Sequence, residues 1–356
     1  MEPQKKSGPY LPQTWSLGGR LEKHVDIPIT AVFLALFIGG AAYHMSIFQI
    51  NRRRNHRFFF SALIFGFCMA RIVTCIMRIA SASLPTDLSL AIAAQIFTAA
   101  GVVILFIVNL VFAQRLIRSS HPRVGWHPFV GALFKFVYAL IVLTIIMVII
   151  VVVQSFYTLS THTHKIDRDI LLYGVTTFAI ISFLPIPLTL AATVIPRSND
   201  RPLDKFGKGR WRYKVSILFV GTILVCFGAS YRAGTTWLTP VPQTRPLPKI
   251  LGKAPFYIVN FTIEVLTVYL YAISRVDKRF HIPDGAKQHK NYQKAAAAAT
   301  SKQRVASDEV EPASEPRTSI SKTAGSSDAG SLQNHASDPK SRDVDIEKYA
   351  AGEANP

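Results

Sequence analysis

Five polar side chains interrupt the long apolar stretches of this chain, and their types suit the recognition of a charged group. They are Arg71, Arg78, Gln95, Asn260 and Glu264. A planar guanidinium can bind a carboxylate, or an anionic ligand, through two parallel hydrogen bonds. An ionisable group in apolar surroundings is energetically expensive unless it is paired or hydrated, so such groups are typical of binding sites. We therefore treat these five residues as candidate ligand-binding residues.

Glu264 is the only carboxylate inside any apolar stretch, and its expected partner is Arg71, with Arg78 as the second choice. Arg71, Thr74 and Arg78 recur at helical spacing, so they share one polar face that must point into the protein. Two interpretations of the pair stay open. It is either a clamp that only fixes how two helices pack, or part of a site for a ligand or ion, and both can hold together.

Seven apolar stretches must position these residues. Each is long enough to cross a bilayer as one helix, for which about 20 residues are needed. The alternative, a soluble helical protein with very apolar cores, is disfavoured because residues 132–153 carry a single charge. The sequence therefore predicts an all-α, polytopic seven-transmembrane helix bundle. The stretches are residues 27–50, 58–80, 88–113, 129–153, 170–195, 215–231 and 255–273.

The depth of each polar residue follows from the rise of an α-helix. At about 1.5 Å per residue, Arg71 and Glu264 each lie roughly 13 Å below the outer boundary of the bilayer. Gln95 lies at about 10 Å and Asn260 at about 7 Å, while Arg78 is near the boundary itself. We expect these groups to converge in the outer half of the bilayer.

The charges of the connecting loops predict the orientation. The loops at residues 51–57, 114–128 and 196–214 hold 14 Lys and Arg, whereas the N-terminal tail and the other loops hold ten. The positive-inside rule then places the C-terminus in the cytosol and the N-terminus on the opposite side, outside the cell or in a lumen. The expected location is the plasma membrane or an endomembrane. The sixth loop, residues 232–254, is external, and its four prolines predict an extended strap over the outer face.

Composition divides the chain into an external N-terminal tail (1–26), the seven-transmembrane domain (27–281) and a disordered cytosolic tail (282–356). Residues 1–281 hold 30 Lys and Arg against 10 Asp and Glu, so the formal charge of +19 belongs to the membrane domain. A nucleic-acid partner is not expected. The expected partners are membrane lipids, including the anionic cytoplasmic leaflet, which attracts basic residues by about 1 kcal/mol each.

Residue patterns that would indicate an enzyme are missing. The sequence has no glycine-rich nucleotide-binding loop, and we expect no enzyme activity, no cofactor and no metal site. His162 and His164 could bind a metal weakly, but we assign them to the fourth loop, which we expect to be external and solvated. The three cysteines fall in apolar stretches, so we expect no external disulfide. Pro185 and Pro187 should interrupt the fifth helix, as a gating hinge or as a bend that improves packing.

Two stretches carry a resemblance to known proteins: residues 69–78, MARIVTCIMR, and residues 99–105, AAGVVIL. With them the chain resembles, over residues 25–283, a fungal family of seven-helix membrane proteins catalogued as a domain of unknown function. More distantly, it is similar to the fungal lipid-translocating exporters. Rhodopsin-like receptors are a poorer match, because residues 109–115 lack the acidic-Arg-aromatic triplet of that class.

We expect an integral membrane protein that is lipid-linked or exporter-like and acts on an amphipathic ligand. The alternative is a receptor-like seven-helix sensor of an external ligand that signals through the basic loop at residues 196–214.

Overall fold

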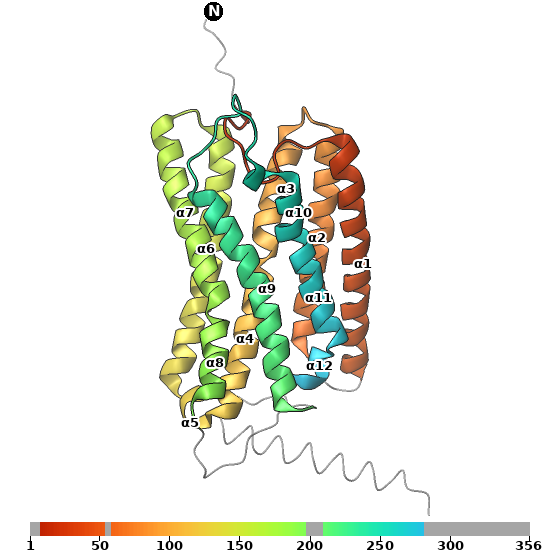
Figure 1. Cartoon of the computed structure of the whole chain (residues 1–356), viewed down its shortest axis with the longest axis vertical. Coiled ribbons are helices and arrows are strands. Elements are labelled where there is room, and N and C mark those ends of the chain that lie inside the picture. The colour runs from red at the N-terminus through yellow and green to blue at the C-terminus, as the bar shows by residue number, and fades with distance from the viewer. Residues whose placement is uncertain (1–7, 54–57, 197–208, 281–356) are drawn as a thin grey trace, which may run out of the picture. The chain divides into compact units, whose positions relative to one another are not determined.

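The computed structural model describes residues 8–53, 58–196 and 209–280. Within these ranges the chain is helical, with one isolated bridge between Thr14 and Pro242 and no strand. Seven helical segments are long and apolar enough to cross a membrane, and they form one bundle (Figure 1). The predicted all-α, seven-span architecture is confirmed. The tail at residues 282–356, predicted to be disordered, lies outside the described residues.

Four spans are single helices: α1 (Lys23–Arg53), α2 (Phe59–Ser83), α6 (Pro128–Tyr157) and α9 (Trp211–Trp237). The third span consists of α3 (Leu88–Gly101) and α4 (Val103–Ser120), and the fifth of α7 (Thr161–Phe183) and α8 (Pro185–Val194). The seventh joins α10 (Lys253–Tyr257), a π-helical turn (Ile258–Thr262) and α11 (Ile263–Ile273). Three short elements complete the described chain: α5 (Pro122–Gly125), a 3₁₀ turn (Lys249–Leu251) and α12 (Val276–Arg279).

The helices continue beyond the apolar stretches, because polar turns at a helix end can extend past the hydrocarbon. Two predictions are corrected for this reason. His162 and His164 lie in the first turn of α7, which Ser160 caps by accepting a hydrogen bond from the Thr163 amide at 3.4 Å, and not in a loop. Glu264 is not the only carboxylate within a span, since α1 includes Asp26 and α7 includes Asp167.

The fifth span is interrupted where its prolines predicted. α7 ends at Phe183 and α8 begins at Pro185, with Leu184 between them. Proline lacks a backbone N–H and its ring crowds the preceding turn, so the helical hydrogen-bond ladder cannot run through. The break lets α8 pack on α4 and α9 while α7 packs on α6 and α9.

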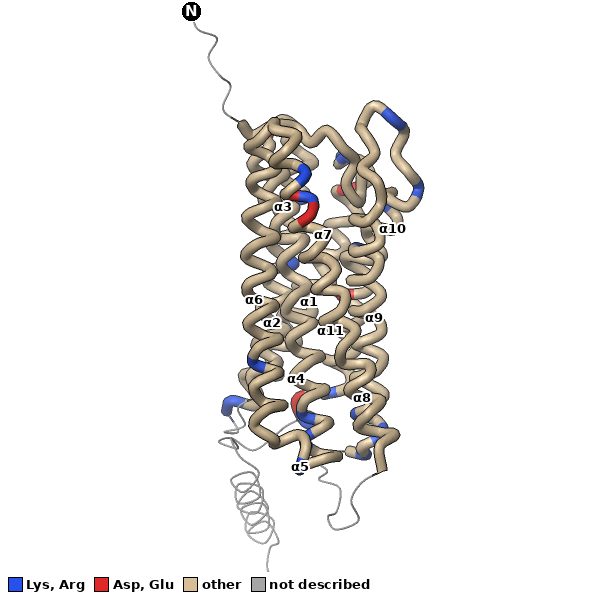
Figure 2. The backbone as a smooth tube through the Cα atoms, turned by 90° about the vertical axis from the view of Figure 1, so that its left-hand side faces the viewer, with Lys and Arg blue, Asp and Glu red and all other residues tan. Residues whose placement is uncertain are grey.

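The two ends of the bundle differ in what closes them. We call the end at which α1 begins the outer end, following the predicted orientation, and the opposite end the inner end. At the outer end the Trp15 amide donates to the Val241 carbonyl at 2.9 Å, and the Gln243 amide donates to the Gln13 carbonyl at 2.9 Å. The proline-rich strap is thus shorter than predicted, residues 238–248, and pairs with the N-terminal segment (Figure 1). Figure 2 shows that Lys and Arg gather toward both ends.

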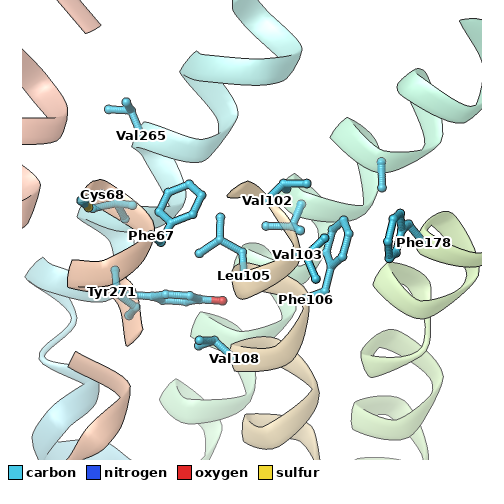
Figure 3. Close-up of a cluster of buried hydrophobic side chains, with 14 of the residues drawn as sticks. Phe67, Cys68, Val102, Val103, Leu105, Phe106, Val108, Phe178, Val265 and Tyr271 are labelled. Atoms are coloured by element: carbon cyan, nitrogen blue, oxygen red, sulfur yellow. The ribbon is translucent and has the colours of Figure 1, made fainter. Parts of the chain in front are cut away.

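The hydrophobic core surrounds α4, which contacts α2, α6, α7, α8 and α9. Phe67 of α2, Leu105 of α4 and Tyr271 of α11 are completely buried and lie around one layer of the core (Figure 3). Phe106 packs on Phe178 of α7, with ring centroids 6.0 Å apart. Each of these buried side chains contributes packing contacts between helices. The layer therefore fixes the relative positions of the helices that carry the polar residues.

Candidate functional site

Arg71 and Glu264 meet inside the bundle, as their depth and opposite charge predicted. Arg71 Nη2 donates to Glu264 Oε1 at 2.5 Å, and the two side chains are 0% and 1% exposed. Arg71 lies midway along α2 and Glu264 lies near the start of α11. The pair therefore lies close to the middle of the bundle along both helices, and its depth in a bilayer stays a prediction.

Arg71 is held on several sides. Its Nη1 donates to the carbonyl of Thr98 at 3.1 Å and faces that of Phe97 at 3.4 Å. In an uninterrupted helix these carbonyls would accept from the amides of Gly101 and Val102, so the inserted guanidinium coincides with the break between α3 and α4. Gly101 provides the space, since a Cβ there would lie 3.2 Å from Arg71 Cζ.

The π-helical turn carries the next polar residue, Asn260. Its Nδ2 donates to the Phe256 carbonyl at 3.2 Å, and its Oδ1 is buried without a hydrogen-bond partner among the described residues. A π-helical turn shifts the residues after it around the helix axis and is frequent at functional sites. The turn ends at Thr262, two residues before Glu264, so it affects the direction in which the Glu264 side chain points.

A second arginine, Arg232, reaches the same carboxylate. Arg232 Nη2 lies 3.5 Å from Glu264 Oε1, and its side chain is 19% exposed. The sequence predicts Arg232 in the sixth loop, which is expected to be external. This prediction is wrong, because α9 continues to Trp237. Its Nε donates to the carbonyl of Gly228 one turn earlier at 3.3 Å. We call Arg71, Glu264 and Arg232 the charge cluster.

The charge cluster contains two guanidinium groups and one carboxylate. Both cations approach Oε1 of Glu264, whereas Oε2 is buried without a hydrogen-bond partner among the described residues. Aromatic rings partly compensate the burial of Arg71, whose Cζ lies 5.6 Å from the ring centroid of Phe67 and 5.9 Å from that of Phe261. The cluster therefore has an excess positive charge in apolar surroundings and an acceptor available for a donor.

Arg78 belongs to a different network, nearer the outer end. It lies 3.6 Å from Asp26 of α1, and not at Glu264. Asp26 also accepts hydrogen bonds from Lys253 Nζ at 2.7 Å and from the hydroxyl of Tyr257 at 2.6 Å. Asp26 is only 2% exposed, so these donors are what allow its charge to be buried. The network ties the start of α1 to α2 and α10.

Gln95 does not join either network, which corrects the predicted convergence. Its side chain is exposed, whereas its neighbours Ile92 and Ala94 are buried. The count of residues gave its depth but not its direction around the helix. Because α3 is apolar on all sides, the sequence there has no polar stripe that would reveal which face points inward.

A third polar group closes the inner end, outside the membrane spans. Asp277 of α12 accepts from Asn51 at 3.0 Å and from Arg275 at 3.1 and 3.2 Å. Burial opposes the ionisation of Asp277, but the hydrogen bonds from Arg275 and Asn51 outweigh it, so the pKa of this carboxyl is lowered from its ordinary value. The group anchors the residues after α11 to the end of α1.

Other candidate features are separate from the charge cluster. A cavity of about 430 Å³ lies between α7 and α9, lined by residues that include Tyr173, Thr176 and Trp237 but none of the cluster. In the ranges that the structure describes, no three His, Cys, Asp or Glu side chains are arranged to hold a metal ion. Cys68 and Cys75 are buried and Cys226 is half-buried, and all three are free thiols.

Two family models match parts of the chain, and neither description names an activity. The model of a family described as "Domain of unknown function (DUF7702)" matches residues 23–205, just over half of the 356 residues. A second, described as "Protein of unknown function (DUF3112)", matches residues 207–281. No curated protein and no solved structure matches the chain.

Proposed function

The chain belongs to the family described as a domain of unknown function (DUF7702), and we propose that it is an exporter-like membrane protein that binds an amphipathic, lipid-like ligand. The observation that carries this proposal is the charge cluster. It is a group of ionic side chains near the middle of a bundle whose core is mainly apolar. A ligand whose polar group reaches this depth keeps the rest of its structure among apolar helices, so it needs an apolar part.

Two features support an exporter-like role in particular. The chain resembles, distantly, the lipid-translocating exporters, with which it shares the seven-helix topology, and a fungal origin is part of the same proposal. The break at Val102 and the break at Leu184 divide two spans into segments. Interrupted helices that carry buried charge are found where membrane proteins form a substrate path. The sequence has no nucleotide-binding loop, so transport would be downhill or driven by a gradient.

The movement of labelled lipid between the leaflets of a vesicle tests this proposal. The full-length protein would be reconstituted into phosphatidylcholine vesicles containing a trace of fluorescent lipid, and dithionite would report how fast the label becomes accessible. We expect the parent protein to accelerate this exchange. The triple variant Arg71→Gln, Glu264→Gln, Arg232→Gln, which removes every charge of the cluster, should fold and lose the activity if the cluster is a site, and keep it if the cluster is only a clamp.

The control is Lys135→Gln, which also removes a charge from a membrane helix but at an exposed position. It should exchange lipid at the parent rate. Parent vesicles no faster than protein-free vesicles would remove the exporter role. Saturable binding of lipid without any exchange would instead favour the receptor-like sensor.

A further inference from the structure

We infer that the ligand carries a single negative charge, that Arg232 binds it, and that Glu264 occupies its position until it arrives. This inference rests on the proposed function and names the chemistry of the ligand's polar group. The class is a monoanionic phosphodiester or carboxylate attached to an apolar body. Glu264 then acts as a built-in competitor of the ligand, and its strength sets how tightly the ligand binds.

The charge balance indicates a monoanion. Arg71 and Arg232 bring two positive charges to one carboxylate, so the cluster is complete only when one further negative charge is present. Uncompensated charge in a medium of low dielectric constant is strongly unfavourable. A ligand with two negative charges would reverse the imbalance, whereas a neutral ligand would leave it in place.

The two arginines are not equivalent, and the difference assigns the ligand to Arg232. Arg71 is 0% exposed and is bound by Glu264 and by the Thr98 carbonyl. Arg232 is 19% exposed, and its contact with Glu264 is a longer 3.5 Å. Its Nε donates to the Gly228 carbonyl, which belongs to its own helix. Arg232 can therefore move from Glu264 to a ligand by giving up one long contact with α11, whereas Arg71 would lose its short hydrogen bond to Glu264 and its hydrogen bond to Thr98 of α3.

The ligand would replace one contact and leave the rest of the cluster intact. When an anion takes the guanidinium of Arg232, Glu264 keeps its short hydrogen bond to Arg71, so no charge is left unpaired. The two oxygens of a phosphodiester or a carboxylate match the planar donors of a guanidinium. The same geometry explains why Glu264, itself a carboxylate, can occupy the position in the absence of ligand.

Affinity measurements on the full-length protein in uncharged maltoside micelles test the inference. The probes are fluorescent phosphatidylglycerol, which has one phosphodiester charge, and diacylglycerol with the same label and no charge. We expect the parent to prefer phosphatidylglycerol. Arg232→Gln should weaken phosphatidylglycerol binding about tenfold or more, since a charge-assisted hydrogen bond is lost, and should leave diacylglycerol unchanged. Lys135→Gln, an exposed charge, should bind both like the parent.

The decisive variant is Glu264→Gln, because a clamp and a competitor predict opposite results. Without the competing carboxylate, phosphatidylglycerol should bind about tenfold more tightly than to the parent and should raise the melting temperature of this variant more than that of the parent. Unchanged or weaker binding by a folded Glu264→Gln protein overturns the inference. If that variant does not fold, Glu264→Asp decides: it keeps the charge with a shorter reach toward Arg232, and its affinity should rise by a smaller factor. An unchanged or reduced affinity overturns the inference here too.

The remaining outcomes separate this inference from the proposed function. Equal binding of the two lipids by the parent overturns the inference and leaves a lipid-binding function standing. Failure of the parent to bind either lipid overturns the proposed function. Excess inorganic phosphate should not displace bound phosphatidylglycerol; displacement would show that the anion comes from water, which removes the lipid as its source.

Discussion

Glu264 accepts a 2.5 Å hydrogen bond from Arg71, although the two residues are 193 positions apart in the chain. The contact joins α2 of the second span to α11 of the seventh span, and both helices also pack against α1. Both side chains are buried, so each depends on the other to have its charge compensated.

We expect the two residues to be strongly coupled in stability. Glu264→Gln should lower the free energy of unfolding by an amount on the order of 3–5 kcal/mol, because it leaves a guanidinium buried without its counter-charge. Adding Arg71→Gln should recover part of the loss, by about 1 kcal/mol or more. Thermal or denaturant unfolding of the parent, both single variants and the double variant measures this. Strict additivity of the two single changes would show that the contact does not contribute to stability.

A methyl group at Gly101 should disturb the same guanidinium. A Cβ there would lie 3.2 Å from Cζ and 3.3 Å from Nε of Arg71, whose other side is held by Glu264 and Thr98. Gly101→Ala should therefore destabilise the protein by about 1–2 kcal/mol, despite the better helix propensity of alanine. Gly66→Ala is the control, because, apart from its chain neighbours and the nearby backbone of its own helix, no atom lies within 4 Å of its added Cβ. It should be neutral or stabilising by up to about 1 kcal/mol, and two equal losses would contradict the role of Gly101.

The number of spans and the Arg71–Glu264 pair could be predicted because both depend on one-dimensional quantities. The length of an apolar stretch identifies a span, and counting residues at a fixed rise gives the depth of a charge. Arg232 was missed because its segment stops being apolar at Tyr231, although the helix does not end there. A signal was present: the buried residues Leu218, Gly221, Val225 and Gly228 follow alternating spacings of three and four, and the next position in the series is 232.

The direction of a side chain around its helix could not be predicted in the same way. Gln95 was expected to join the other polar residues but is exposed, and Arg78 pairs with Asp26, which precedes the first apolar stretch. The π-helical turn and the break at Val102 are tertiary effects, the latter coinciding with the guanidinium of Arg71. Such features depend on neighbours that are distant in the sequence.

The orientation of the bundle remains a prediction that labelling can check. His162, in the first turn of α7, and Arg210, before the first turn of α9, are both exposed and lie at opposite ends. In a Cys226→Ser background, a cysteine replacing His162 should react with an impermeant maleimide on intact cells. A cysteine replacing Arg210 should react only after permeabilisation. The reverse pattern would invert the assigned topology.

The basic inner end should prefer anionic lipid. Arg52 and Arg53 at the end of α1, and Arg210 and Arg212 at the start of α9, are exposed. Replacing all four with Gln should reduce the preference for phosphatidylserine over phosphatidylcholine, by about 1 kcal/mol per residue before salt screening. Quenching of tryptophan fluorescence by brominated lipids reports this, since Trp211 lies between two of the arginines. Arg245→Gln, exposed at the outer end, is the control, and a parent protein without any preference would refute the prediction.

The last prediction concerns pH and the inner-end group around Asp277. The carboxyl is 2% exposed and accepts from Asn51 and Arg275, which lower its pKa from the ordinary 3.8. A group whose folded-state pKa is lowered stabilises the folded state above its unfolded pKa and loses that contribution as the pH falls through the folded value. Asp277→Asn should therefore be less stable than the parent by about 1–2 kcal/mol at neutral pH, a range reduced because solvent screens the partly exposed Arg275. The difference in the free energy of unfolding should be constant above about pH 5 and shrink below pH 3.8.

Melting curves across this pH range measure the difference. The exposed Asp169→Asn is the matched control and should show little difference at any pH. A gap between Asp277→Asn and the parent that persists unchanged at the lowest pH would show that the ionised carboxylate is not what holds α12 in place.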